Sequence, residues 1–166
     1  MRNLFEPIPP HFDPWQFARQ EQEKSYQLPL AQTQELSAAY GFAPEATIRL
    51  QLRGYVDSQK QCHLAGRVAA ELQTTCARCL EALPLALDES FDYVLVATEE
   101  QPVSGEWESL LCPDEELNLA WWMEEEVLLA IPMIAKHEHC EAPHFAQEAM
   151  PEDRPNPFAV LKNRKD

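Results

Sequence analysis

Apolar and polar residues alternate through most of residues 47–95, which is the pattern of β-strands that bury one face. The alternation occurs in three stretches, separated by a polar turn at Asp57–Gln61 and a cysteine-containing turn at Cys76–Cys79. Because short turns join consecutive stretches, the pattern predicts two successive hairpins of an antiparallel meander. The apolar positions that share a face are Ile48, Leu50 and Leu52 in the first stretch, Cys62, Leu64, Gly66, Val68, Ala70 and Leu72 in the second, and Leu83, Leu85, Leu87, Phe91, Tyr93 and Leu95 in the third.

A different period follows in residues 119–131, where apolar residues recur at intervals of three and four. Asn118 precedes this stretch and is a favourable N-cap residue, and Pro132 follows it. The pattern predicts an amphipathic helix between these two residues. The apolar positions are Leu119, Trp122, Met123, Val127, Ala130 and Ile131.

The acidic side of this helix is a candidate partner-binding face. Glu124 and Glu125 fall opposite the apolar stripe together with Trp121 and Leu128, so the outer face combines carboxylates with exposed apolar surface. The alternative is ordinary packing of this face against the N-terminal segment.

Shorter elements precede the meander and carry no evident chemistry. The cap and turn signals predict a helix over residues 13–24 with Asp13 as its N-cap, an extended piece over 26–30, and a helix over 34–40 that begins after Thr33 and ends at a left-handed Gly41. Residues 97–113 are acidic and poorly periodic, so we expect a loop there.

These elements indicate the α+β class. We expect an antiparallel β-meander, or a partly closed, barrel-like sheet, with short flanking helices and a Pro-rich C-terminal tail. The expected organisation is a Pro-rich N-terminal lead at 1–12, a single domain at 13–145, and an extended, Pro-rich tail with a basic end at 146–166.

Charge is distributed unevenly along the 166 residues, whose formal net charge is −15. From Cys79 to Ala135 there are 14 Asp and Glu residues and no Lys or Arg. Because phosphate binding depends on cationic side chains, this segment opposes direct contact with nucleic acid. A solvated acidic face without any partner is the plainer interpretation. No apolar run approaches the ~20 residues that cross a bilayer, and the N-terminus lacks a signal-peptide pattern, so we expect a cytoplasmic protein.

Two short clusters of metal-ligand residues flank the acidic segment. Cys76 and Cys79 have the spacing at which two thiolates grip one ion, and His137 and Cys140 repeat that gap, with His139 as the substitute for His137. More than fifty residues separate the pairs, so the hypothesis is a long-range zinc site rather than a zinc finger. The alternatives are a reduced cysteine pair packed at a hairpin tip and a redox disulfide.

The C-terminal tail keeps apolar residues beside its basic end. Asn156, Pro157, Phe158 and Leu161 lie in a stretch that a freely solvated tail would not need. This composition indicates a docking segment, either on a partner or on the acidic domain of the same chain.

Several of these pieces together resemble the YceD family of bacterial proteins, named as large ribosomal RNA subunit accumulation proteins. The pieces are Cys-Ala-Arg-Cys-Leu at 76–80, Met-Glu-Glu-Glu-Val-Leu-Leu-Ala-Ile-Pro at 123–132, the His137–Cys140 cluster, and Arg-Pro-Asn-Pro-Phe-Ala-Val-Leu at 154–161. The resemblance runs from about Asp13 to the end of the chain. It implies a cytosolic, non-enzymatic role in the accumulation or processing of large-subunit rRNA, with metal as a stabilising feature that other branches of the family lack.

Three functional hypotheses follow. The preferred one is a ribosome-assembly factor that reaches large-subunit precursors through a ribosomal protein or an rRNA-processing factor, with weak direct binding to naked RNA. The second is a zinc-stabilised protein adaptor that does not act on rRNA. The third is an enzyme that uses Glu124, Glu125 and the histidines as acid and base groups, which the sequence disfavours because no phosphate-binding glycine loop or nucleophile elbow is present.

Overall fold

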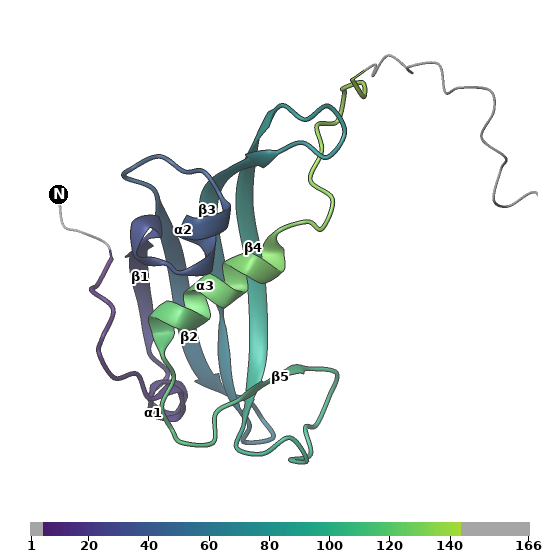
Figure 1. Cartoon of the computed structure of the whole chain (residues 1–166). Helices are drawn as coiled ribbons and strands as arrows, with labels where there is room; N and C mark the ends of the chain where they lie inside the picture. The colour runs from purple at the N-terminus through teal and green to yellow at the C-terminus, as the bar shows by residue number, and fades with distance from the viewer. Residues whose placement is uncertain (1–4, 144–166) are drawn as a thin grey trace, which may run out of the picture.

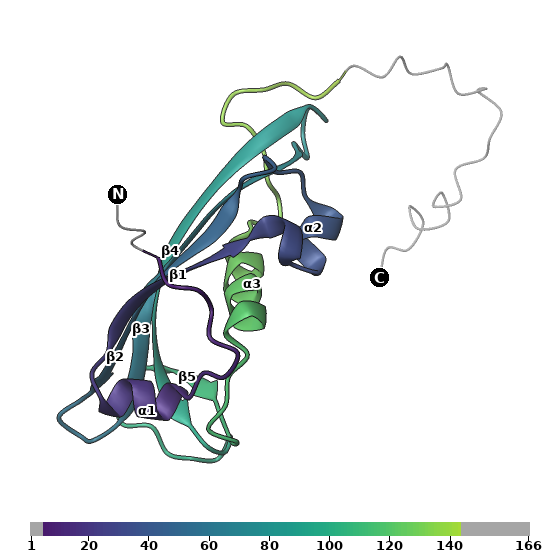
Figure 2. The same ribbon diagram turned by 90° about the vertical axis from the view of Figure 1, so that its left-hand side faces the viewer.

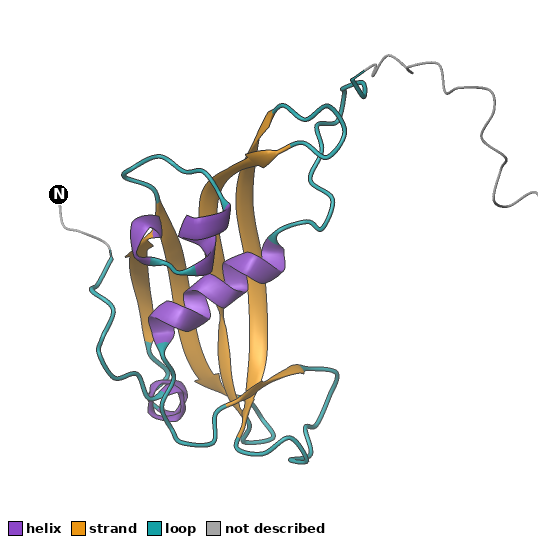
Figure 3. Cartoon of the chain, in the orientation of Figure 1, coloured by secondary structure: helices purple, strands orange, loops and turns teal. Residues whose placement is uncertain are grey.

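A computed structural model describes residues 5–143, which form a five-stranded sheet with short helices packed against it (Figures 1 and 3). The strand order in the sheet follows the order in the chain. The elements are α1 (Pro14–Arg19), β1 (Glu23–Pro29), the 3-10 turn η1 (Leu30–Gln32), α2 (Glu35–Ala39), β2 (Thr47–Val56), β3 (Cys62–Thr75), β4 (Ala82–Val96), β5 (Glu108–Leu111) and α3 (Leu119–Ala130).

The predicted antiparallel meander is present in β1 to β4. Leu50 of β2 pairs with Tyr26 of β1 and with Val68 of β3, and Leu72 of β3 pairs with Leu85 of β4. The alternation therefore predicted both hairpins correctly. The observed register agrees with the shared apolar faces, since a one-residue slip would turn the apolar set of each strand to the opposite face.

The fifth strand corrects the prediction of a purely antiparallel sheet and of a loop throughout residues 97–113. Strand β5 pairs in parallel with the end of β4, from Tyr93–Glu108 to Val96–Leu111. A parallel pair requires the chain to cross over before it returns, and residues 97–107 make that crossover. The sheet is therefore mixed.

Helices α2 and α3 both lie on one face of this sheet and leave the other face uncovered by helices, as Figure 2 shows. The structure is thus an open, two-layer α+β arrangement, and the prediction of a partly closed barrel is wrong. Apolar residues of β1, β2 and β3 pack in this layer against α3, whose inner side is formed by Leu119, Trp122, Met123 and Val127. None of the helices in residues 5–143 is long and apolar enough to cross a membrane.

The ends of α3 follow the sequence signals. The Asn118 side chain accepts a hydrogen bond from the backbone N–H of Trp121 at 3.1 Å, which is the N-cap interaction expected of it. The helix ends at Ala130, with Ile131 as its C-cap and Pro132 immediately after. Proline cannot donate the next helical hydrogen bond, so the chain leaves the helix there.

The N-terminal elements are shorter than predicted. Helix α1 begins at Pro14 with the Asp13 carboxylate as its cap, but it ends at Arg19, and β1 starts at Glu23. Gly41 does not adopt a left-handed conformation: its backbone exchanges hydrogen bonds with Gln73 of β3, at 2.8 and 2.6 Å, in an isolated antiparallel bridge. Pairing with the sheet, not a glycine stop, therefore sets the path of the chain after α2.

Glu124 is buried, which corrects its assignment to the outer partner-binding face. Its carboxylate accepts hydrogen bonds from the backbone N–H groups of Gln34, Glu35 and Leu36, at 3.1, 2.7 and 2.9 Å. These donors lie at the start of α2 and have no partner within that helix. Glu124 thus caps α2 from α3, and the side of α3 that carries it faces the protein.

We expect Glu124→Ala to destabilise the fold by about 2–3 kcal/mol, because three backbone donors lose a charged acceptor. The matched control is Glu125→Ala, since Glu125 is half-exposed and makes no hydrogen bond within residues 5–143. Urea unfolding of both variants measures the difference. Equal free energies of unfolding for the two variants would contradict the capping role of Glu124.

Candidate metal centre

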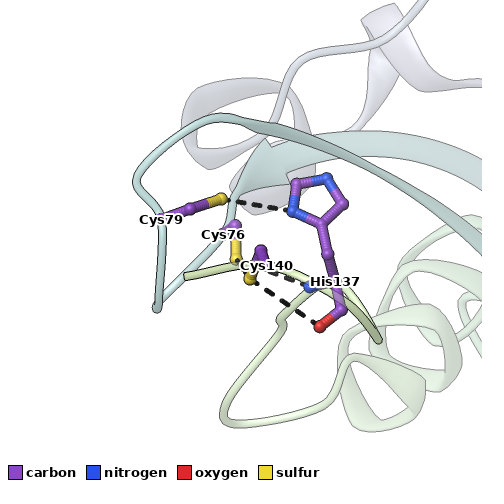
Figure 4. Close-up of side chains that lie close together, drawn as sticks. All are labelled: Cys76, Cys79, His137 and Cys140. Atoms are coloured by element: carbon purple, nitrogen blue, oxygen red, sulfur yellow. Dashed lines mark hydrogen bonds between the residues drawn. The ribbon is translucent and has the colours of Figure 1, made fainter. Parts of the chain in front are cut away.

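The turn between β3 and β4 meets the segment that follows α3 at one end of the sheet. Cys76 directly follows β3, and Cys79 comes three residues later in the same turn. After Pro132 the chain returns to this turn, where the Ala77 N–H donates to the Ala135 carbonyl at 2.8 Å. This backbone contact aligns the two segments, so the four predicted side chains converge (Figure 4).

The four converging residues are Cys76, Cys79, His137 and Cys140, hereafter the ligand cluster, and their candidate donor atoms all lie within 4.8 Å of one another. The Cys76 and Cys140 Sγ atoms are 3.7 Å apart, and Cys79 Sγ is 3.3 Å from Nδ1 of His137. Zinc–sulfur bonds of about 2.3 Å in a tetrahedron place two sulfurs about 3.8 Å apart. The donor set and its spacing therefore fit a tetrahedral metal site.

Backbone groups stabilise negative charge on the sulfur of Cys76. The N–H groups of Arg78 and His137 both approach its Sγ at 3.4 Å. Burial opposes ionisation of this thiol, but the hydrogen bonds from Cys79, His137 and Arg78 outweigh it and lower the pKa of Cys76 to about 5. A thiolate is the form that binds a metal, so the backbone prepares Cys76 for that role.

Cys140 is held differently, because it comes from the segment after α3. Burial raises the pKa of Cys140, and hydrogen bonds with the thiols of Cys76 and Cys79 raise it further. The guanidinium of Arg78 donates to the Cys140 carbonyl at 3.1 Å and so ties this residue to the β3–β4 turn. Sequence reasoning missed this role of Arg78, whose only signal was its position between the two turn cysteines.

The structure also decides between the two candidate histidines. His137 belongs to the ligand cluster, whereas His139 is exposed and outside it. All five cysteines are free thiols in this structure. Cys62 and Cys112 are buried and lie outside the cluster, and burial raises the pKa of Cys112 to about 11, as expected of an inert core thiol.

The remaining candidate residues are separated from the ligand cluster. Trp121 is 55% exposed and Glu125 is half-exposed, so both reach the surface of α3, while Glu124 is internal. Further apolar side chains are exposed at the end of α3 and beyond it: Leu129, Met133 and Ile134. The tail candidates Asn156, Pro157, Phe158 and Leu161 lie outside the described residues.

A buried polar group that the sequence pattern did not reveal lies near the β2–β3 turn. His63 is fully buried, with Nδ1 3.0 Å from Asp92 and Nε2 3.4 Å from Asp57. The Tyr55 hydroxyl donates to Asp92 at 2.7 Å, and burial followed by this hydrogen bond raises the pKa of Tyr55 to about 12. The side chains of this group hydrogen-bond to one another and so stabilise the turn. Little in the sequence indicated the group, because a single histidine in an alternating strand does not identify its partners.

The structure defines an α+β protein with an open mixed sheet and a cluster of four potential metal ligands at one end of that sheet. The sequence profile described as "Large ribosomal RNA subunit accumulation protein YceD" matches residues 64–165. The chain is also 35% identical over 131 residues to the Large ribosomal RNA subunit accumulation protein YceD of Haemophilus influenzae, covering 70% of this chain and 73% of that protein. The chain belongs to the YceD family. No solved structure matches it.

We expect His137→Ala to lose most of the metal-binding capacity of the protein, because only His137 brings a ring nitrogen to the three thiols. His139→Ala is the matched control and should keep the capacity of the unaltered chain. Elemental analysis after purification without chelator, and again after loading and dialysis, gives the identity and stoichiometry of the metal. Equal metal content in the two variants would show that the site is assembled differently.

Proposed function

We propose that this protein supports the accumulation of large-subunit ribosomal RNA as a non-enzymatic assembly factor in the cytoplasm. The observation that carries the proposal is membership of the YceD family, together with similarity to a relative named for large-subunit rRNA accumulation over most of both chains. The acidic segment and the ligand cluster then indicate how such a factor works.

The metal of the ligand cluster is zinc in this proposal. Three thiolates and one imidazole are ligands that zinc favours, and four protein ligands complete its tetrahedron. A complete shell leaves no position for a substrate, which supports a structural role and a function without catalysis. Bound metal would fasten the β3–β4 turn to the segment after α3 and would add its binding free energy to that of folding.

Contact with the pre-ribosome runs through a basic protein in this proposal, either a ribosomal protein or an rRNA-processing factor. The acidic segment from Cys79 to Ala135 forms β4, β5 and α3, and several of its carboxylates, among them Glu89, Glu99 and Glu108, are exposed. Such a surface attracts a basic partner and speeds its capture at low salt. Glu125 and Trp121 remain candidates for this contact, whereas Glu124 is excluded by its internal hydrogen bonds.

The second candidate is a zinc-stabilised adaptor that acts away from rRNA. The exposed apolar side chains of Trp121, Leu129, Met133 and Ile134 favour it, since such a group of side chains suits many protein partners. Both candidates predict bound zinc and a protein partner. They differ in whether the partner belongs to the large subunit.

We expect deletion of the gene to lower large-subunit rRNA relative to small-subunit rRNA, and the tagged protein to sediment with large-subunit precursors. Gradient fractionation with quantitative RNA measurement checks both outcomes, and re-expression of the unaltered chain is the control. An unchanged ratio of large-subunit to small-subunit rRNA, with the tagged protein bound only to non-ribosomal proteins, would contradict the assembly role and support the adaptor role.

We also expect no tight binding of the purified protein to naked large-subunit rRNA at about 0.15 M salt. The 14 acidic residues between Cys79 and Ala135 repel phosphate and are not offset by any Lys or Arg in that segment. Fluorescence anisotropy with labelled rRNA fragments measures this, with a basic RNA-binding protein as positive control. Submicromolar binding that weakens with salt would show that the protein contacts RNA directly.

A further inference from the structure

A cavity of about 430 Å³ opens between the C-terminal half of α3 and strands β4 and β5. Figure 1 shows α3 crossing the sheet diagonally, with its later turns over β4. The register pairs Tyr93 of β4 with Glu108 of β5, and both residues line the cavity together with Glu89 of β4. The lining residues that bear on its chemistry are Glu89, Phe91, Tyr93, Glu108, Glu126 and Leu129.

Glu126 is the buried charge of this cavity, with 9% of its surface exposed. One carboxylate oxygen accepts a hydrogen bond from the Tyr93 hydroxyl at 3.1 Å. Burial raises the pKa of Glu126, and the negative charge of Glu108 raises it further, while hydrogen bonding from Tyr93 and Trp122 acts in the opposite direction. The carboxylate is therefore buried in a site that disfavours its charge.

Buried carboxylates are normally paired with a cation, because the cost of removing the charge from water is otherwise uncompensated. Within residues 5–143, no Lys, Arg or His forms an ion pair with Glu89, Glu108 or Glu126. The acidic segment contains no Lys or Arg from which a cation could come. One buried carboxylate, Glu126, and two exposed ones, Glu89 and Glu108, thus line the cavity without a cationic partner within residues 5–143.

The walls of the cavity add a second requirement on its occupant. Phe91 and Tyr93 stack with ring centroids 5.5 Å apart, so an aromatic pair lies beside the carboxylates. Leu129 lines the same cavity and is 76% exposed, which gives the opening an apolar edge. A planar guanidinium can bond to carboxylates in its plane and stack on an aromatic face, whereas an ammonium offers only a point charge.

We propose that this cavity receives an arginine side chain of a basic partner protein, bound by Glu126 with Glu89 and Glu108, while an apolar partner residue packs on Leu129. The inference deepens the proposed function, because it rests on contact through a basic protein. It places the recognition of that partner in the cavity under α3 rather than on the outer surface formed by Trp121 and Glu125.

The test uses L-argininamide as the probe and the full-length protein purified without chelator. NMR titration should show saturable shifts at residues of the cavity, and the uncharged, nearly isosteric L-citrullinamide should cause none. Glu126→Gln should raise the dissociation constant of argininamide at least about tenfold, the loss of one charged hydrogen-bonding partner. Glu99→Gln, an exposed residue of the same acidic segment outside the cavity, should change it less than about twofold.

Stability provides a readout that a purely structural Glu126 would not give. A raised pKa in the folded state means that the stabilising, protonated form is lost as pH rises through that pKa. Glu126→Gln keeps an acceptor for Tyr93 and removes the charge, so the variant should match the unaltered protein near pH 4.5 and melt about 2–4 °C higher at pH 8. The groups facing Glu126 are Tyr93 and Glu89 on β4 and Glu108 on β5, and none is cationic.

Loss of argininamide binding with a gain of stability in Glu126→Gln supports the proposal. Unchanged binding in that variant, equal binding of citrullinamide, or lower stability of the variant at every pH would overturn it. A negative probe experiment with normal sedimentation on large-subunit precursors rejects the cavity and leaves the assembly role in place. Positive probe binding in a protein that never associates with those precursors rejects the assembly role and leaves the cavity as an arginine site.

Discussion

The tie between the β3–β4 turn and the segment after α3 is the constraint on which the rest of the structure depends. The 12-residue helix α3 is held on the sheet by its apolar side. That packing alone does not fix the path of the residues that follow the helix. The Ala77–Ala135 hydrogen bond and the four side chains of the ligand cluster supply that path. These contacts join residues more than fifty positions apart. The sheet is therefore connected to α3 by packing along the helix and to the segment after α3 by the ligand cluster.

Three consecutive glutamates of α3 show how this arrangement gives identical residues different roles. Successive helical residues point about 100° apart, so the neighbours of each carboxylate differ. Glu124 points to the start of α2 and accepts three backbone hydrogen bonds, Glu125 is half-exposed, and Glu126 lies in the cavity with Tyr93. The three carboxylates of the helix therefore do not form one acidic surface, and those of Glu125 and Glu126 alone remain available to a partner.

The same glutamates mark the limit of what could be predicted from the sequence. The alternation of apolar residues predicted the meander, and cap residues predicted the limits of α3, because these are local signals. The position of Glu124 depends on α2, which approaches that side of α3 from 89 residues away, and no local pattern contains that information. Strand β5 was not predicted for a similar reason, because its four residues are too few to show an alternating pattern. The cysteine spacing indicated the ligand cluster and favoured His137 over His139, and the return of the chain beside Ala77 brings His137 into the cluster.

The ligand cluster and the arginine cavity lie at the same end of α3, and this has a mechanical consequence. Glu124 and Asn118 secure the helix through hydrogen bonds to α2 and to its own first turn. Its last turn, with Glu126 and Leu129 at the cavity, is followed within six residues by the contact of Ala135 with the β3–β4 turn. Because the helix ends at Ala130 without a capping side chain, the restraint on this turn comes from tertiary contacts that the metal would reinforce. Metal bound at the cluster would therefore restrain the chain next to the cavity.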